Sequence, residues 1–140
     1  MVIISIIGIA CILVLLYMYK EGHENNIRSH EVKATGDSET INLFFISDTH
    51  ARKINEAMID SIDQKIQAVL IGGDFVDRRT SEETVLHNIR TLKKLGPTYF
   101  IWGNNDIEFG EQKLRQLLAD HHIRIIENGT VKLESKNDVS

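Results

Sequence analysis

Three short polar motifs directly follow apolar runs of the chain. They are Asp48-Thr49-His50 after the run 41–46, GGDFVDRR at 72–79 and GNND at 103–106. Carboxylate, amide oxygen and imidazole suit Mn²⁺, Fe, Zn²⁺ or Mg²⁺, and they do not suit Cu(I) or iron–sulfur clusters. Two such ions about 3.5–4 Å apart can clamp a phosphate and generate hydroxide at neutral pH. Each motif alone is an ordinary turn or helix cap, so the metal hypothesis depends on their joint occurrence.

The elements that must position these motifs alternate between strand and helix. Apolar runs predict strands at 41–46, 68–71, 98–102 and 123–126, and helical spacing predicts helices at 54–67, 81–96 and 111–121. Asn128-Gly129 predicts a hairpin into a last strand at 131–134. The order β-α-β-α-β-α-β-β predicts an α/β fold with a parallel sheet. Sites in such sheets lie beyond the carboxyl ends of the strands, where all three motifs fall.

Composition narrows the class of function. The chain has 140 residues, with 16 Lys and Arg against 20 Asp and Glu, a net charge of −4 and 6% aromatics. This mildly acidic chain lacks the basic patch of a nucleic-acid-binding protein, so no nucleic-acid partner is predicted. The single cysteine, Cys11, excludes a disulfide framework or a CxxC metal clip. The sequence contains no GxxxxGK[ST], GxGxxG or GxSxG motif.

The first 19 residues predict a membrane anchor. Residues 2–19 carry no charge, and at about 1.5 Å per residue they approach the thickness of a bilayer core. A cleaved signal peptide would need a basic start and a small-residue cleavage site. A lipoprotein site at Cys11 conflicts with the apolar run that continues past it, and a buried core helix would be apolar on one stripe only.

The sequence thus predicts three segments. They are a transmembrane helix at 1–19, a polar linker at 20–40 and a soluble domain at 41–140. Positive residues follow the anchor and none precedes it, which favours a single-pass membrane protein with a cytoplasmic soluble part.

The pattern D-x-H, GD-x-x-D-R and GN-x-D resembles the calcineurin-like metallophosphoesterase superfamily over residues 41–140. With the apolar N-terminus, it looks most like small bacterial membrane-associated phosphoesterases. The resemblance implies a transmembrane helix followed by one half of a metallophosphoesterase αββα sandwich. It also implies metal-dependent hydrolysis of a phosphate mono- or diester with two divalent ions, drawn from Mn, Fe, Zn or Mg.

The same resemblance implies a set of metal ligands. Asp48 and His50 would hold the first metal, Asp74 would bridge both metals, and Asn104 would bind the second metal beside the phosphate. Asp77 would support the ligands from behind.

Asn104, Asp106 and Arg78 are the implied catalytic residues, with Arg78 close to the substrate. Asn105 departs from the family pattern, which has a histidine oriented by the following acid. An amide cannot serve as a general acid near pH 7, so water or the substrate would have to protonate the leaving group.

The family completes its metal site with histidine motifs that are missing from these 140 residues. His121 and His122 fall at the opposite end of the predicted sheet and do not replace them. The simplest interpretation is a truncated reading frame or fragment, which could be inactive, with a shortened metal-binding module as the alternative. One sheet face would then be uncovered and apolar. The rival function is a non-catalytic membrane-tethered α/β module that binds a protein partner or a single metal.

Overall fold

The computed structural model describes residues 2–22, 26–32 and 40–131. The chain divides into two compact units, Met1–Val32 and Lys33–Ser140. Part of the predicted linker at 20–40 and residues 132–134 of the predicted last strand lie outside the described residues.

The first unit contains a single described helix, α1 (Val2–Gly22), where the sequence predicted one. The prediction that it crosses a membrane is not supported, because no helix in the described part of the chain is long and apolar enough to do so. The prediction of a transmembrane helix at 1–19 is therefore corrected, and the segment is described only as a helix.

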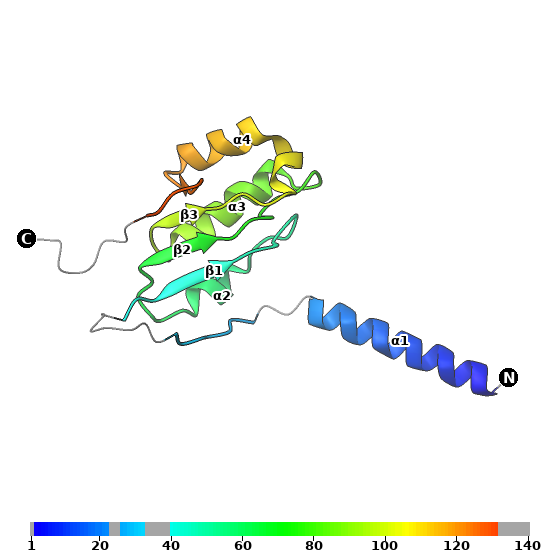
Figure 1. The fold of residues 1–140 in the computed structure, drawn as a ribbon. Coiled ribbons are helices and arrows are strands. Elements are labelled where there is room, and N and C mark those ends of the chain that lie inside the picture. The colour runs from blue at the N-terminus through cyan, green and yellow to red at the C-terminus, as the bar shows by residue number, and fades with distance from the viewer. Residues whose placement is uncertain (1, 23–25, 33–39, 132–140) are drawn as a thin grey trace, which may run out of the picture. The chain divides into compact units, whose positions relative to one another are not determined.

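The second unit is built on a parallel four-stranded sheet in the order β1-β2-β3-β4. Its strands are β1 (Leu43–Ile46), β2 (Ala68–Ile71), β3 (Thr98–Phe100) and β4 (Arg124–Ile125). The connecting helices are α2 (Glu56–Asp60), α3 (Glu82–Lys93) and α4 (Asp106–Asp120) (Figure 1). The predicted parallel α/β arrangement is thus confirmed up to β4. Since β1, β2 and β3 are neighbours, the three motifs that follow them start from adjacent strand ends.

Helix α2 is much shorter than the predicted helix 54–67. Asn55 caps its start by accepting a hydrogen bond from the Met58 N–H, and the Ser61 hydroxyl donates to the Met58 carbonyl at its end. Serine near a helix end competes for backbone hydrogen bonds and favours termination. Ile54 and Ile66 lie in irregular backbone before and after α2, and both are nevertheless buried. Their spacing therefore reflected burial and not a continuous helix.

Helix α4 starts five residues before its predicted start at 111. Gly110 lies inside it with non-helical angles, φ 114 and ψ 101, so a short first segment joins the main helix across a kink. A residue with a side chain is strained at that positive φ, which glycine adopts freely. The regular helix after the kink matches the prediction, and the extra segment begins directly at the GNND motif.

The two faces of the sheet differ in burial. Ile71 and Phe100 are fully buried in the core, which also contains Ile89 of α3, and Figure 1 shows α3 behind β2 and β3. On the opposite face Leu43 is 49% exposed and Phe45 is 62% exposed. Within the described residues, one face of the sheet is therefore packed against helices while the edge strand β1 leaves apolar side chains open, as the sequence predicted.

Candidate metal centre

Three of the predicted ligands converge at the carboxyl ends of β1 and β2. Asp48, His50 and Asp74 each offer one ligand atom, and these atoms all lie within 4.8 Å of one another. Pairing between the two segments continues beyond the strands, since the Asp48 N–H donates to the Gly73 carbonyl at 3.2 Å and the His50 N–H to the Asp74 carbonyl at 3.1 Å. The sheet thus sets the spacing of the three ligands through the backbone.

The backbone at all three ligands is left-handed. Asp48 has φ 55, His50 has φ 48 and Asp74 has φ 49. Residues with a side chain visit this region rarely, although Asp, Asn and His tolerate it better than most. Strained backbone of this kind gathers at functional sites, where the surrounding structure enforces it. Here the three left-handed residues are the same three whose ligand atoms converge.

Asp106 enforces the conformation of the loop that carries Asp74. Its carboxylate is fully buried and accepts hydrogen bonds from the N–H groups of Asp74 at 3.0 Å, Val76 at 2.9 Å and Gly103 at 2.7 Å. Burial raises the pKa of Asp106, because the ionised form loses hydration, and the three N–H donors oppose that rise. The residue therefore ties the loops after β2 and β3 together at the base of the site.

Gly103 brings the loop after β3 close to Asp74. A Cβ at this position would lie 2.2 Å from the Asp74 backbone nitrogen and 2.3 Å from its Oδ1. Only glycine permits that approach. As a result the next residues can reach the carboxylate, and the Asn105 N–H donates to Asp74 Oδ1 at 2.9 Å while the Asn105 Nδ2 donates to Oδ2 at 3.0 Å.

A second carboxylate, that of Asp77, lies beside the His50 ring. The ring Nδ1 is buried without a hydrogen-bond partner and lies 3.6 Å from Oδ2 of Asp77. Hydrogen bonds from the Arg79 side chain hold the pKa of Asp77 at about 2, so this carboxylate stays charged. A carboxylate facing one ring nitrogen leaves the other free to bind a metal. The donor set therefore fits a divalent cation.

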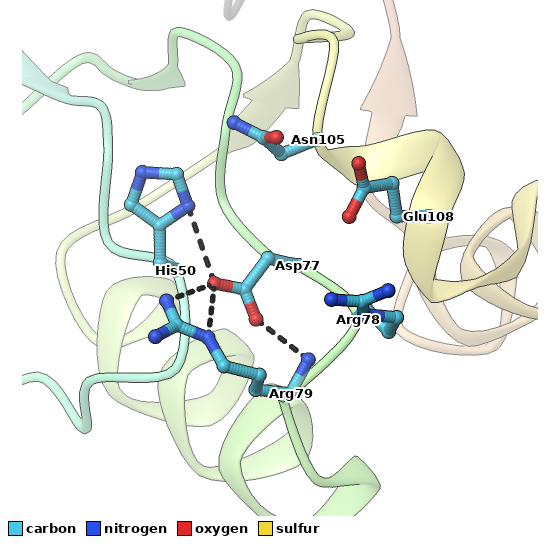
Figure 2. Close-up of a pocket in the computed structure, with 6 residues that line it drawn as sticks. All are labelled: His50, Asp77, Arg78, Arg79, Asn105 and Glu108. Carbon is cyan, nitrogen blue, oxygen red and sulfur yellow. Dashed lines mark hydrogen bonds and ion pairs between the residues drawn. The ribbon is translucent and has the colours of Figure 1, made fainter.

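A pocket of about 280 Å³ opens beside this cluster. Figure 2 shows its lining residues, which are His50, Asp77, Arg78, Arg79, Asn105 and Glu108. Arg79 is paired with Asp77, whereas Arg78 is exposed at the pocket wall. A guanidinium in that position suits an anionic group such as a phosphate.

The other predicted site residues have different surroundings. Asn104 is exposed and lies between Gly103 and Asn105, two residues that contact or closely approach Asp74. Asp106 is buried and bonded to backbone, and Arg78 lines the pocket. The roles of Asn104 as a ligand and of all three as catalytic residues stay predictions.

Sequence reasoning missed two contacts that shape the site. The hydroxyl of Thr49, which lies between two ligands, donates to the Phe75 carbonyl at 2.7 Å and anchors its loop in the interior. Asn105 binds both oxygens of Asp74. A Thr between two ligands and an Asn before an acidic helix start were the available signals, but neither identifies a partner more than 20 residues away.

Comparisons with known proteins agree with this geometry. A family model described as calcineurin-like phosphoesterase matches residues 41–136. The uncharacterized protein YpbG of Bacillus subtilis (strain 168) is 27% identical over 131 residues, covering 91% of this chain and 51% of YpbG. The uncharacterized metallophosphoesterase YkoQ of the same organism is 22% identical over 146 residues, covering 93% of this chain and 54% of YkoQ. The chain thus spans about half the length of these relatives. No solved structure matches it significantly.

Proposed function

The chain belongs to the calcineurin-like phosphoesterase family, and on that premise we propose that it hydrolyses a phosphate mono- or diester with two divalent metal ions. The observation that carries the proposal is the convergence of Asp48, His50 and Asp74 within 4.8 Å. Hard oxygen donors and an imidazole at one sheet edge suit Mn, Fe, Zn or Mg.

Each residue contributes through its position. Divalent ions, when bound, supply Lewis acidity and lower the pKa of coordinated water. Asp48 and His50 would hold the first ion, Asp74 would bridge the pair, and Asn104 would complete the second position. Strand ends that are fixed by backbone hydrogen bonds keep these donors in place without the substrate.

The pocket supplies contacts for the phosphate. Arg78, exposed at its wall, would pair with a phosphate oxygen by charge-assisted hydrogen bonds. Asn105 lines the same pocket but has an amide, which does not transfer a proton near pH 7. The leaving group would then take its proton from water or from elsewhere in the substrate.

The test is hydrolysis of bis(p-nitrophenyl) phosphate by the whole chain with added Mn²⁺. We expect turnover that requires Mn²⁺ and that falls at least about 100-fold in Asp74→Asn. Mutating even a residue that only hydrogen-bonds to a metal ligand typically lowers metal affinity or activity by about 10- to 100-fold. Asp63→Asn removes an exposed carboxylate outside the cluster and serves as the matched control. Metal-dependent turnover retained by Asp74→Asn would refute the assigned site. Mn²⁺ binding without any turnover would favour the non-catalytic alternative.

A further inference from the structure

Asn105 occupies the N-cap position of α4 but does not cap the helix. An N-cap asparagine usually accepts a hydrogen bond from an N–H group in the first turn. The Asn105 backbone has φ −78 and ψ −21, and its side chain makes no capping hydrogen bond. By contrast, Asn55 and Ser81 at the N-caps of α2 and α3 both accept such a bond. The side chain of Asn105 therefore serves something outside its own helix.

That partner is the carboxylate of Asp74, 31 residues away in the chain. The Asn105 N–H donates to Oδ1 at 2.9 Å and its Nδ2 donates to Oδ2 at 3.0 Å. Two donors on the two oxygens fix the rotation of the carboxylate as well as its position. Each carboxylate oxygen accepts at more than one lone pair, so both oxygens keep capacity for a cation.

We infer that Asn105 is a positioning residue that holds the Asp74 carboxylate in the orientation in which it meets divalent cations. The inference rests on the proposed function, because it assumes that Asp74 is a metal ligand. It assigns to Asn105 a role different from proton transfer. The Asn105 side chain bonds to the Asp74 carboxylate in place of capping α4.

The two hydrogen bonds respond differently to substitution. The bond from the backbone N–H survives in Asn105→Ala, whereas the bond from Nδ2 is lost. The variant should therefore weaken cation binding without removing it. Asn105→Leu has nearly the shape of asparagine, keeps the backbone N–H and lacks only the side-chain donor, so it separates the loss of the hydrogen bond from the loss of side-chain volume.

The experiment is a Mn²⁺ titration of the whole chain, in which binding is measured by calorimetry and by the EPR signal of free Mn²⁺. We expect the Kd to rise by about 10-fold or more in both variants, as for other residues that orient metal ligands. Gln116→Ala removes an exposed amide on α4 and should bind Mn²⁺ like the unaltered chain. A purely structural role would lower the metal-free melting temperature of the Asn105 variants and leave their Kd like that of Gln116→Ala, whereas a positioning role raises the Kd.

The outcomes separate this inference from the proposed function. If the unaltered chain does not bind Mn²⁺, or if Asp74→Asn binds equally well, the proposed function fails and the inference fails with it. If Asp74→Asn abolishes binding while both Asn105 variants bind like the unaltered chain, only the role of Asn105 is overturned. If Asn105→Ala does not fold, the Asn105→Leu titration decides.

Discussion

The buried carboxylate of Asp106 accepts a hydrogen bond from the backbone N–H of Asp74, with 3.0 Å between Oδ2 and the nitrogen. The same carboxylate accepts from Gly103 and Val76. One side chain at the start of α4 thus joins the loops that follow β2 and β3. Because Asp74 is also a predicted ligand, the candidate metal centre and the stability of the fold depend on the same contact.

Replacing Asp106 with alanine should therefore be strongly destabilising. It leaves three N–H groups without an acceptor, and a buried unpaired donor costs about 1–3 kcal/mol. We expect the free energy of unfolding to fall by about 3 kcal/mol or more, measured by urea denaturation of the metal-free chain. Asp106→Asn keeps one oxygen acceptor and should lose less. Asp120→Ala, at the exposed far end of α4, is the control, and equal losses in Asp106→Ala and Asp120→Ala would contradict the prediction.

The convergence of the candidate ligands at the strand ends could be predicted because its signal is local. Asp48, His50 and Asp74 are hard donors that directly follow apolar strands, and neighbouring parallel strands bring such residues to one edge. The sequence could not predict that Asn105 would bind Asp74, because that contact joins loops 31 residues apart. Only the close approach at Gly103 makes it possible.

Capping residues inside the predicted helix 54–67 explain why that helix was predicted too long. The spacing of Ile54 and Ile66 predicted a helix through residue 67, but the caps at Asn55 and Ser61 limit α2 to Glu56–Asp60. Apolar spacing reports which residues are buried, and here irregular backbone buries the same residues that a longer helix would have buried.

The left-handed backbone of Asp48 predicts a difference between two substitutions that both remove its carboxylate. An L-residue in this region is strained by roughly 1–2 kcal/mol, whereas glycine is not. Asp48→Gly should therefore be more stable than Asp48→Ala by about 1 kcal/mol in metal-free chemical denaturation. Both variants should lose Mn²⁺ affinity to the same degree, which provides the internal control. An alanine variant as stable as the glycine variant would show that the backbone there is not strained.

A methyl group at Gly103 should directly disturb the candidate metal centre. It would lie 2.2 Å from the backbone nitrogen of Asp74, an atom that cannot move without shifting the loop. We expect Gly103→Ala to lose Mn²⁺ binding by at least about 10-fold, as seen when ligand orientation is disturbed. Gly129→Ala has its nearest neighbour at 3.5 Å, an ordinary contact, and should bind normally in the same titration. Normal binding by Gly103→Ala would mean that the close approach is dispensable.

Asp77 and Arg79 predict a specific dependence of stability on pH. The Arg79 side chain holds the pKa of Asp77 at about 2, below its usual 3.8. A carboxyl group with a lowered pKa in the folded state stabilises the fold above its unfolded pKa, and the stabilisation is lost as the pH falls through the folded value. The contribution should therefore be constant from neutral pH down to about 4 and disappear between about 4 and 2.

The variant Arg79→Leu isolates the contribution of the Asp77–Arg79 pair to the stability of the metal-free chain. The difference in free energy of unfolding between the unaltered chain and Arg79→Leu should be steady above about pH 4 and shrink toward zero near pH 2. The Arg79 side chain is 76% exposed, so solvent screens the pair and added salt should reduce the difference further. Arg90→Leu removes another exposed arginine and should show no change across this window. A difference that stays flat from pH 5 to 2 would mean that Arg79 is not what keeps Asp77 charged behind His50.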